Sequence, residues 1–256
     1  MNDDAFTTTS VVDLDLGWTI TGHLNGGYLA AMLSKTASDA VGGSDPLTVS
    51  AHYLAPVRGG GSADMGVDVV RRARLSTARV ALSRGGVSMV EGYVTCGRAA
   101  AVAPSLNHAQ PPQLPAWADC PDAGGGFDVP GMELLQMLEL RPHPEDAAAL
   151  SSRRPNARAH IRGWVGYRDR RPVDLLLALA AWDVFPPTPW VAGVWGRMPT
   201  VSAQVAFYSG EIRGPLIVEA WCDVLQDGIV DELARVWDST RRLISTARQT
   251  AILLPA

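Results

Sequence analysis

The sequence carries little charge and almost no lysine. Charged residues make up 19% of its 256 residues, and Lys35 is the only lysine. A formal net charge of −4 excludes the strongly basic surface on which nucleic-acid binding depends. A chain this poor in charge buries much of its surface, so we expect a homo-oligomer of two or more copies. Arginine in place of lysine, together with abundant alanine, indicates GC-rich codons and hence a bacterial source.

The sequence also lacks disulfide and membrane signals. Three widely spaced cysteines, Cys96, Cys120 and Cys222, form neither a disulfide framework nor a zinc-binding pattern. The first ten residues include two acids and no apolar core, which argues against a signal peptide. The longest purely apolar run, 175–182, is far too short to cross a bilayer. We therefore expect a cytoplasmic protein with reduced cysteines and no membrane partner.

Several enzyme signatures are missing. The sequence has no G-x-S-x-G nucleophile elbow, no H-E-x-x-H zinc motif and no phosphate-binding P-loop. We expect no metal and no cofactor, because the histidines show no ligand spacing: His23, His52, His108, His143 and His160.

A short repeat marks two corresponding places in the chain. The tetrapeptide TVSA occurs at 48–51 and again at 200–203. Each copy follows an apolar segment typical of a helix and begins a series of four β-rich runs. One repeated tetrapeptide is expected about once by chance in a chain of this length. The shared order of elements is therefore the stronger sign of an internal duplication.

The two predicted helices begin and end at recognisable signals. The first runs over 28–41, with Asn25 as its N-cap. The second opens at Pro172 and is closed by Pro186. The four runs that follow the first helix predict an antiparallel meander. Before the second helix, 132–141 and 157–169 predict two further strands.

Both helices are apolar on nearly every face, which predicts burial all round. A helix enclosed by a curved antiparallel sheet is the hotdog fold. We therefore predict an α+β double hotdog whose two sheets join edge to edge. Its parts are an N-terminal hotdog at 1–97, a linker at 98–130 rich in proline, alanine and glycine, and a C-terminal hotdog at 131–256.

Three polar residues of the second half are candidates for chemistry. Asp183 ends an apolar helix, where the macrodipole is negative and burial penalises a carboxylate. Such a position needs nearby donors or a role for a basic carboxylate, unless Asp183 only caps a loop or reaches solvent. Thr200 opens a strand and Gln249 lies in an apolar one. Taken singly, the simpler interpretation is an ordinary strand threonine for Thr200 and a surface residue of an edge strand for Gln249.

The motifs around these residues resemble a known family. The segments LALAAWD, MPTVSAQVAFY and LISTARQTAIL resemble the C-terminal half of the acyl-CoA thioesterase II family. GHLNGGYLAAML resembles the start of the helix in that family's N-terminal half. The resemblance runs from about residue 14 to 254. It implies a double hotdog that hydrolyses acyl-CoA in fatty acid metabolism, with the attacking water held by Asp183, Thr200 and Gln249.

The chemistry suits these residue types. A carboxylate can take the proton of water as a general base, while threonine and glutamine orient water by hydrogen bonds. Backbone N–H groups of Asn25, Gly26 and Gly27 could bind the thioester oxygen at a helix N-terminus. The two glycines could equally serve helix–sheet packing. His23 could line the substrate pocket or be structural.

The two halves differ at the candidate site. The first half keeps Thr48, but has 34–36 (Ser-Lys-Thr) at the position of Asp183 and Thr95 at the position of Gln249. This asymmetry predicts one active site in each chain.

Two other functions remain open. A hotdog enoyl-CoA hydratase or dehydratase needs an Asp–His pair, for which His23 with Asp13 or Asp15 is the candidate. A non-catalytic acyl-CoA-binding hotdog would bind acyl-CoA without turnover. The arginines of a strand end could either meet coenzyme A phosphates or be solvated: Arg71, Arg72 and Arg74.

Overall fold

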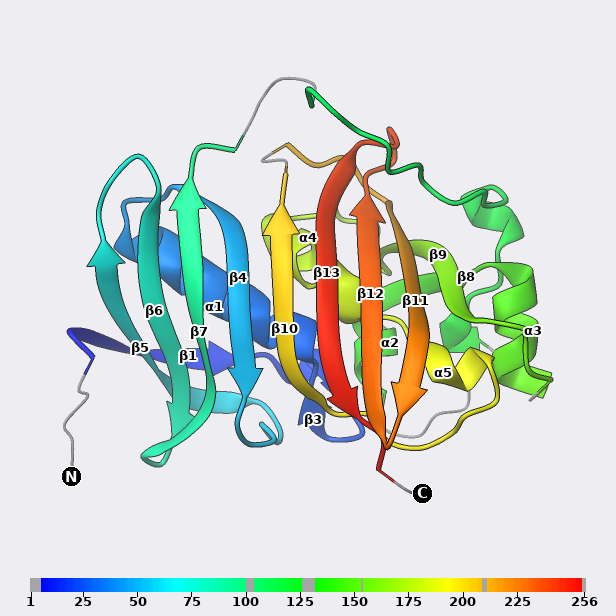
Figure 1. The fold of residues 1–256 in the computed structure, drawn as a ribbon, viewed down its shortest axis with the longest axis horizontal. Helices are drawn as coiled ribbons and strands as arrows, with labels where there is room; N and C mark the ends of the chain where they lie inside the picture. The colour runs from blue at the N-terminus through cyan, green and yellow to red at the C-terminus, as the bar shows by residue number, and fades with distance from the viewer. Residues whose placement is uncertain (1–5, 100–103, 126–131, 153, 209–210, 255–256) are drawn as a thin grey trace.

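The centre of the molecule is one antiparallel sheet of eleven strands (Figure 1). The computed structural model describes residues 6–99, 104–125, 132–152, 154–208 and 211–254. In chain order the strands are β1 (Thr8–Leu14), β4 (Asp45–Tyr53), β5 (Gly61–Arg71), β6 (Ser76–Arg84), β7 (Val87–Gly97), β8 (Leu138–Pro142), β9 (Ala159–Tyr167), β10 (Thr200–Phe207), β11 (Leu216–Gln226), β12 (Ile229–Trp237) and β13 (Leu243–Ile252). Across the sheet they follow the order β1-β5-β6-β7-β4-β10-β13-β12-β11-β9-β8. Two short strands, β2 (Thr19–Ile20) and β3 (His23–Leu24), pair separately.

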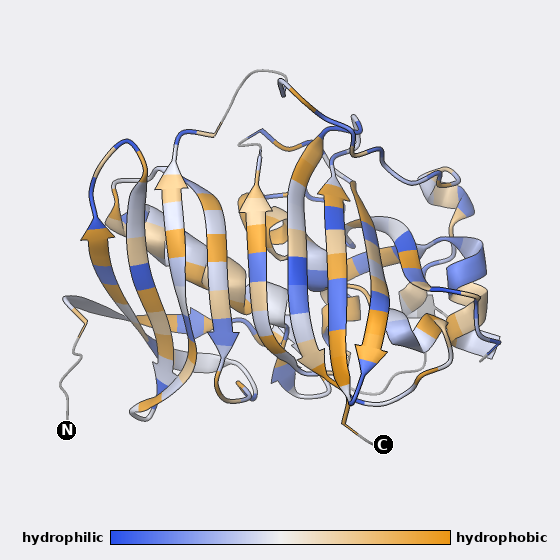
Figure 2. Cartoon of the chain, in the orientation of Figure 1, coloured by the Kyte–Doolittle hydropathy of each residue, from blue (hydrophilic) through white to orange (hydrophobic). Residues whose placement is uncertain are grey.

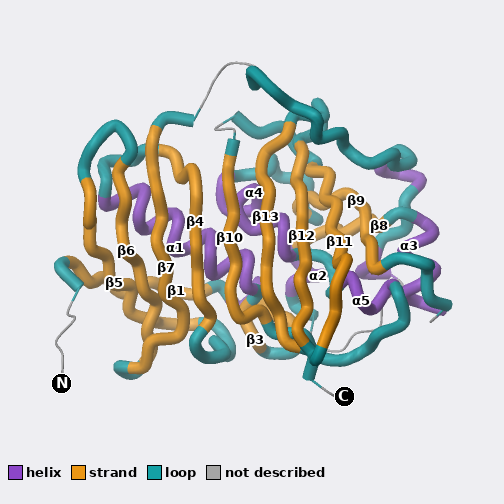
Figure 3. The backbone as a smooth tube through the Cα atoms, in the orientation of Figure 1, coloured by secondary structure: helices purple, strands orange, loops and turns teal. Residues whose placement is uncertain are grey.

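Two helices lie on one face of this sheet, behind it in Figure 3. They are α1 (Gly26–Ala40) behind the first half and α4 (Leu175–Ala180) behind the second. The predicted α+β double hotdog is therefore confirmed. Smaller helices cover the end of the sheet near β8: α2 (Leu134–Met137), α3 (Pro144–Ser152) and α5 (Thr188–Val191).

The two TVSA strands are direct neighbours. Strand β4 pairs antiparallel with β10, so that Ala51 lies opposite Ala203 and Val49 opposite Val205. This pairing joins the two halves edge to edge, as expected. It also corrects the predicted meander: only β5, β6 and β7 follow one another across the sheet, whereas β4 lies beyond β7. One edge of β4 pairs with β7 and its other edge pairs with β10, so β4 is the last strand of the first half.

Helix α1 forms where its capping signals predict it. The Asn25 side chain accepts a hydrogen bond from the Tyr28 N–H at 2.9 Å, which satisfies one of the free donors of the first turn. Gly42 and Gly43, both with positive φ, follow the helix. Because glycine adopts this conformation without strain, the chain can turn sharply into β4.

Helix α4 is shorter than predicted. Asp174 is its N-cap and accepts a hydrogen bond from the Leu177 N–H at 2.9 Å. Pro172 therefore lies outside the helix, because the carboxylate, and not the proline ring, organises its first turn. The last turn tightens into a 3-10 segment, Ala181–Asp183 (η4), which carries Asp183 at its end.

Other local expectations have mixed outcomes. Segment 157–169 contains β9 as predicted, but 132–141 begins with α2 before β8. Neither α3 nor the edge strand β1 was expected from the sequence. The described part of the linker, 104–125, holds short 3-10 turns without a strand and runs past the upper ends of the second-half strands in Figure 1. The division at 97/98 and 130/131 stays a prediction.

The sheet has one buried face and one face toward solvent. Figure 2 shows hydrophilic residues between apolar ones along the face opposite the helices. Arg248 on β13 pairs there with Asp231 on β12 at 2.8 Å. Apolar side chains of the strands pack against α1 and α4 and form the core. Among the described helices, none has the length and apolar character needed to cross a bilayer.

Candidate active site

A pocket of about 730 Å³ is lined by residues of both halves. The first half contributes the start of α1 and the segment after β4. The second half contributes η4, β10, β12, β13 and the segment 184–198. Most of the wall is apolar and includes Leu24, Leu29, Val57, Phe185, Trp190 and Ile252. Segment 184–198 contains α5. Within it the rings of Trp190 and Trp195 pack together, with their centroids 5.4 Å apart.

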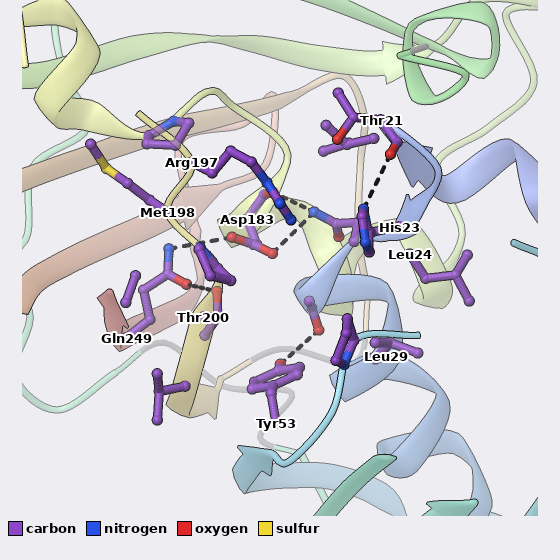
Figure 4. Close-up of a pocket in the computed structure, with 18 of the residues that line it drawn as sticks. Thr21, His23, Leu24, Leu29, Tyr53, Asp183, Arg197, Met198, Thr200 and Gln249 are labelled. Atoms are coloured by element: carbon purple, nitrogen blue, oxygen red, sulfur yellow. Dashed lines mark hydrogen bonds between the residues drawn. The ribbon is translucent and has the colours of Figure 1, made fainter. Parts of the chain in front are cut away.

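The N-terminus of α1 points at the Asp183 carboxylate (Figure 4). Its oxygen Oδ2 accepts hydrogen bonds from the Gly27 N–H at 2.8 Å and from the Asn25 Nδ2 at 3.0 Å. The same Asn25 nitrogen also donates to the Asp183 backbone oxygen at 2.6 Å. The positive end of α1 thus compensates the unfavourable end of α4. A helix of the other half supplies the donors that the position of Asp183 requires.

The Asp183 carboxyl group is poised to accept a proton near neutral pH. Burial raises its pKa from 3.8 to about 7, although the hydrogen bond from Gly27 acts in the opposite direction. The negative charge of Glu232 raises the pKa further, and the hydrogen bond from Gln249 lowers it. A general base works best when its pKa is close to the operating pH.

Thr200 and Gln249 lie in the same pocket as Asp183. The Thr200 hydroxyl donates to Gln249 Oε1 at 2.7 Å. The Gln249 amide nitrogen lies 3.3 Å from Asp183 Oδ1. The structure therefore brings together the three side chains singled out in the sequence, each from a different element: η4, β10 and β13. Gln249 is 7% exposed and is not a surface residue of an edge strand.

The glycine pair acts differently from expectation. The Gly27 N–H is used by Asp183, and Gly27 does not line the pocket. A Cβ atom on Gly27 would lie 2.4 Å from the Ala180 backbone oxygen. This glycine therefore allows close packing between the two helices α1 and α4, whereas the sequence suggested packing between a helix and the sheet. Gly26 does line the pocket, and its backbone also hydrogen-bonds Asp183. Of the three expected oxyanion donors, the Asn25 N–H donates to the Trp18 backbone oxygen at 3.0 Å, and the Gly27 N–H donates to Asp183.

The remaining sequence candidates lie in different places. Asn25 and His23 both line the pocket. The Nδ1 atom of His23 lies 3.1 Å from the Thr21 backbone oxygen, and its Nε2 has no hydrogen-bond partner in the described part of the chain. Arg71, Arg72 and Arg74 lie outside the pocket lining, at the end of β5 and in the turn after it.

Sequence reasoning missed two polar residues of the site, Glu232 and Tyr53. Glu232 lines the pocket and contacts both Gln249 and Thr188. Tyr53 donates its hydroxyl to the Gly26 backbone oxygen at 2.7 Å. Burial and the Asp183 charge hold the Tyr53 pKa well above its usual range, so the phenol stays neutral. The only available signal for Glu232 was a carboxylate at an alternating, inward position of a strand.

The corresponding place in the first half holds no carboxylate. Ser34 is buried there in α1, and its hydroxyl donates to the Ala30 backbone oxygen at 2.8 Å. Thr95 lies opposite Thr48 on β7 and supplies a hydroxyl in place of an amide. The Thr95 hydroxyl hydrogen-bonds to the Thr77 hydroxyl at 3.3 Å, and none of these hydroxyl residues is a base.

Family comparison agrees with this two-part organisation. Residues 14–97 match the model of the acyl-CoA thioesterase N-terminal domain, and residues 107–253 match that of the C-terminal domain. The chain belongs to the acyl-CoA thioesterase family. This thioesterase resembles an uncharacterized protein of Mycobacterium tuberculosis, with 27% identity over 268 residues, which cover 94% of this chain and 89% of the relative.

Solved structures agree with the fold of this thioesterase. It superimposes on a candidate thioesterase II from Thermobifida fusca with a TM-score of 0.85 and 26% identity, covering 96% of this chain and 92% of that one. A hot dog fold protein of unknown function from Alicyclobacillus acidocaldarius gives a TM-score of 0.82 at 19% identity, covering 99% and 95%. The enzyme is a thioester hydrolase that acts on acyl-CoA.

The hydratase alternative is not supported by the site. The Asp15 carboxylate accepts a hydrogen bond from the Gly17 N–H at 2.8 Å, and neither Asp15 nor Asp13 lines the pocket. Among the described residues, no hydrogen bond joins either of them to His23. The Asp–His pair that this chemistry needs is therefore not assembled by these residues.

Proposed function

We propose that Asp183 is the general base of acyl-CoA hydrolysis and that Thr200 and Gln249 orient the attacking water. The observation that supports this most strongly is the buried carboxylate, which shares one pocket with a hydroxyl and an amide. Its raised pKa keeps Asp183 basic enough to take a proton at neutral pH. A buried carboxylate without a chemical role would have cost stability for no gain.

The free lone pairs of the site define where this water binds. Among the described residues, Asp183 Oδ1 accepts only the long contact from Gln249, at 3.3 Å, and so has room for a second donor. The Thr200 oxygen donates to Gln249 and keeps its own lone pairs for a second hydrogen of the water. A water between these two oxygens donates to both, and its lone pair faces the open pocket where the thioester carbon would lie.

The proposed reaction is a simple addition and elimination. Water adds to the thioester carbon while one of its protons moves to Asp183. The C–S bond of the tetrahedral intermediate then breaks, and coenzyme A leaves as a thiolate. The proton on Asp183 neutralises the leaving sulfur, so the products are the free acid and coenzyme A thiol, and the carboxylate is restored.

The two kinds of wall suit the two parts of an acyl-CoA. The apolar wall fits an acyl chain, because such surface gains free energy when it is removed from water. Arg58 and Arg197 are exposed lining residues of a chain with net charge −4. We propose that these guanidinium groups bind the coenzyme A phosphates and that His23 contacts the substrate near the reacting group.

A thiol-release assay across acyl-CoA chain lengths tests the proposal. We expect free coenzyme A to appear with at least one chain-length class and to be lost in Asp183→Asn. Saturable binding of acyl-CoA, measured by calorimetry, without thiol release for any chain length would instead identify a non-catalytic acyl-CoA-binding protein.

The biological setting is a further part of the proposal. We infer a cytoplasmic enzyme of bacterial fatty acid metabolism, organised as hotdog units at 1–97 and 131–256. We also propose a homo-oligomer, because the sheet ends in open edges at β1 and β8 and open edges favour pairing or coverage. Light scattering should give a mass of at least two chains, and a monomer at micromolar concentration would contradict this.

A further inference from the structure

We propose that Glu232 is a positioning residue of the hydrolytic site, which fixes the end of the Gln249 amide that faces Asp183. This inference rests on the proposed role of Asp183. Glu232 does not need to touch the substrate to act, because it works through the orientation of one amide group.

Glu232 is held directly beside Gln249 by the register of the sheet. The two residues lie opposite each other on β12 and β13. Glu232 is 8% exposed, and its Oε1 accepts a hydrogen bond from Gln249 Nε2 at 2.8 Å. This contact is shorter than the 3.3 Å between the same nitrogen and Asp183. Glu232 is thus the nearer acceptor of the amide.

The other oxygen of Glu232 is already committed. Its Oε2 accepts from the Thr188 N–H at 2.8 Å and from the Thr188 hydroxyl at 2.6 Å. A backbone N–H can only donate, so this side of the glutamate must be an acceptor. The ionised carboxylate presents acceptors on both sides, and Gln249 must therefore turn its NH₂ group toward it.

The polarity of the whole chain of contacts follows from this constraint. With NH₂ toward Glu232, the second hydrogen of the Gln249 amide points to Asp183 Oδ1. The amide oxygen then accepts the Thr200 hydroxyl hydrogen, which leaves the Thr200 lone pairs for water. A flipped amide would bring its oxygen against the Asp183 carboxylate and its NH₂ against Thr200. The Thr200 oxygen would then accept from the amide and turn its own hydrogen toward the water, so the water would lose Thr200 as an acceptor.

The charge of Glu232 also acts on Asp183. It raises the pKa of Asp183, after the effects of burial and the Gly27 hydrogen bond. Burial raises the pKa of Glu232 itself, while donors from Thr188 and Gln249 favour its ionised form. A buried carboxylate beside a second one is costly. Two donors from Thr188 and one from Gln249 offset part of this cost and fix the orientation of the carboxylate.

The test is a double-mutant cycle between Glu232→Gln and Gln249→Ala. The Glu232→Gln side chain keeps the shape but must place its oxygen at Thr188 and its NH₂ toward Gln249, which favours the flipped amide. We expect kcat for acyl-CoA hydrolysis to fall by about 10- to 100-fold, the scale of a mispositioned reacting group, with KM nearly unchanged. In the Gln249→Ala background, Glu232→Gln should change kcat at pH 9 by less than about 2-fold, because Asp183 is ionised there in every variant and residues that act as one unit are not additive.

Glu139→Gln is the matched control. Glu139 is a carboxylate with 3% exposure, paired with Arg141 at 2.6 Å, and it does not line the pocket. Its substitution should leave kcat unchanged. If Glu232→Gln does not fold, Thr188→Val replaces it in the cycle, since it removes one of the two donors to Glu232 Oε2. We expect Thr188→Val to lower kcat less than Glu232→Gln does. This loss should also disappear in the Gln249→Ala background.

The outcomes separate this inference from the proposed function. Unchanged turnover in Asp183→Asn would refute the catalytic site itself. Loss of turnover in Asp183→Asn together with wild-type kcat in Glu232→Gln would refute only the role of Glu232. Additive losses in the double variant would also overturn it, because they would assign Glu232 a purely structural role between α5 and the sheet.

Discussion

The backbone N–H of Gly27 lies 2.8 Å from the carboxylate oxygen of Asp183, although 156 positions separate the two residues. This contact joins the N-terminus of α1 in one half to the end of η4 in the other. The carboxylate gains a donor and a favourable dipole there, yet its burial keeps its pKa near 7. The interface between the two halves therefore creates the base.

Replacement of the proposed base should remove activity without unfolding the protein. Asp183→Asn keeps the shape of the side chain but cannot accept a proton from water. We expect kcat to fall by about 100-fold or more, as the loss of a general base implies. Circular dichroism and the melting temperature should show a folded protein. Asp174→Asn, at the other end of α4, is the control and should retain activity because asparagine is an equally good N-cap.

The pH profile should report the raised pKa of Asp183. The ionised form is the active base, so kcat/KM should rise about tenfold per pH unit below pH 7 and level off above it. The midpoint of this limb should lie close to the pKa of about 7. Initial rates between pH 5 and 9 measure it. A limb centred near pH 4, the ordinary value for an aspartate, would show that another group or an unperturbed carboxyl controls the rate.

The two glycines at the start of α1 should separate stability from activity. A Cβ atom in Gly27→Ala would meet the Ala180 oxygen at 2.4 Å and the Asp183 Cβ at 2.9 Å. We expect it to lose about 1–3 kcal/mol of unfolding free energy, as overpacking does, and to lose activity as well. In Gly26→Ala the nearest atom is Asp183 Oδ2 at 3.0 Å, so activity should fall with less effect on stability. Urea unfolding and thiol release measure the two effects, and equal stability losses would contradict this difference.

The two pocket arginines should act on substrate binding and not on chemistry. Arg58→Gln and Arg197→Gln each remove one charge from the pocket wall. We expect KM for acyl-CoA to rise about 10-fold for each, the scale of a hydrogen bond to a charged group, with little change in kcat. A thioester of N-acetylcysteamine has no phosphates and should be unaffected.

Arg72→Gln provides the control for these two variants, because Arg72 lies outside the pocket lining. Its KM should equal that of the wild type. An equal rise of KM for the phosphate-free thioester would contradict phosphate binding by Arg58 and Arg197.

Local signals were sufficient for most elements of the fold. Asn25 ahead of an apolar run predicted the start of α1, and β-rich runs predicted β5, β6 and β7. Such signals act within a few residues, because capping and strand propensity are local. Where a second local signal competed, the prediction was wrong: Asp174, and not Pro172, begins α4.

The candidate site divides in the same way. Asp183, Thr200 and Gln249 could be named from motifs in a fixed order, and an aspartate at an unfavourable helix end already indicated that something else must stabilise it. The sequence alone did not reveal what that partner was. Gly27 was expected to bind substrate but binds Asp183, and Glu232 was not expected at all.

The sequence by itself determined most of the segments that become helices and strands, which half carries the carboxylate and which residue types are available for hydrolysis. Only the tertiary structure decided that α1 points its N-terminus at Asp183 and that β12 places Glu232 opposite Gln249. The physical reason is the range of the interactions. Periodicity and capping depend on neighbours in the chain, whereas the pKa of a buried carboxyl group and the orientation of an amide depend on groups that only folding brings together.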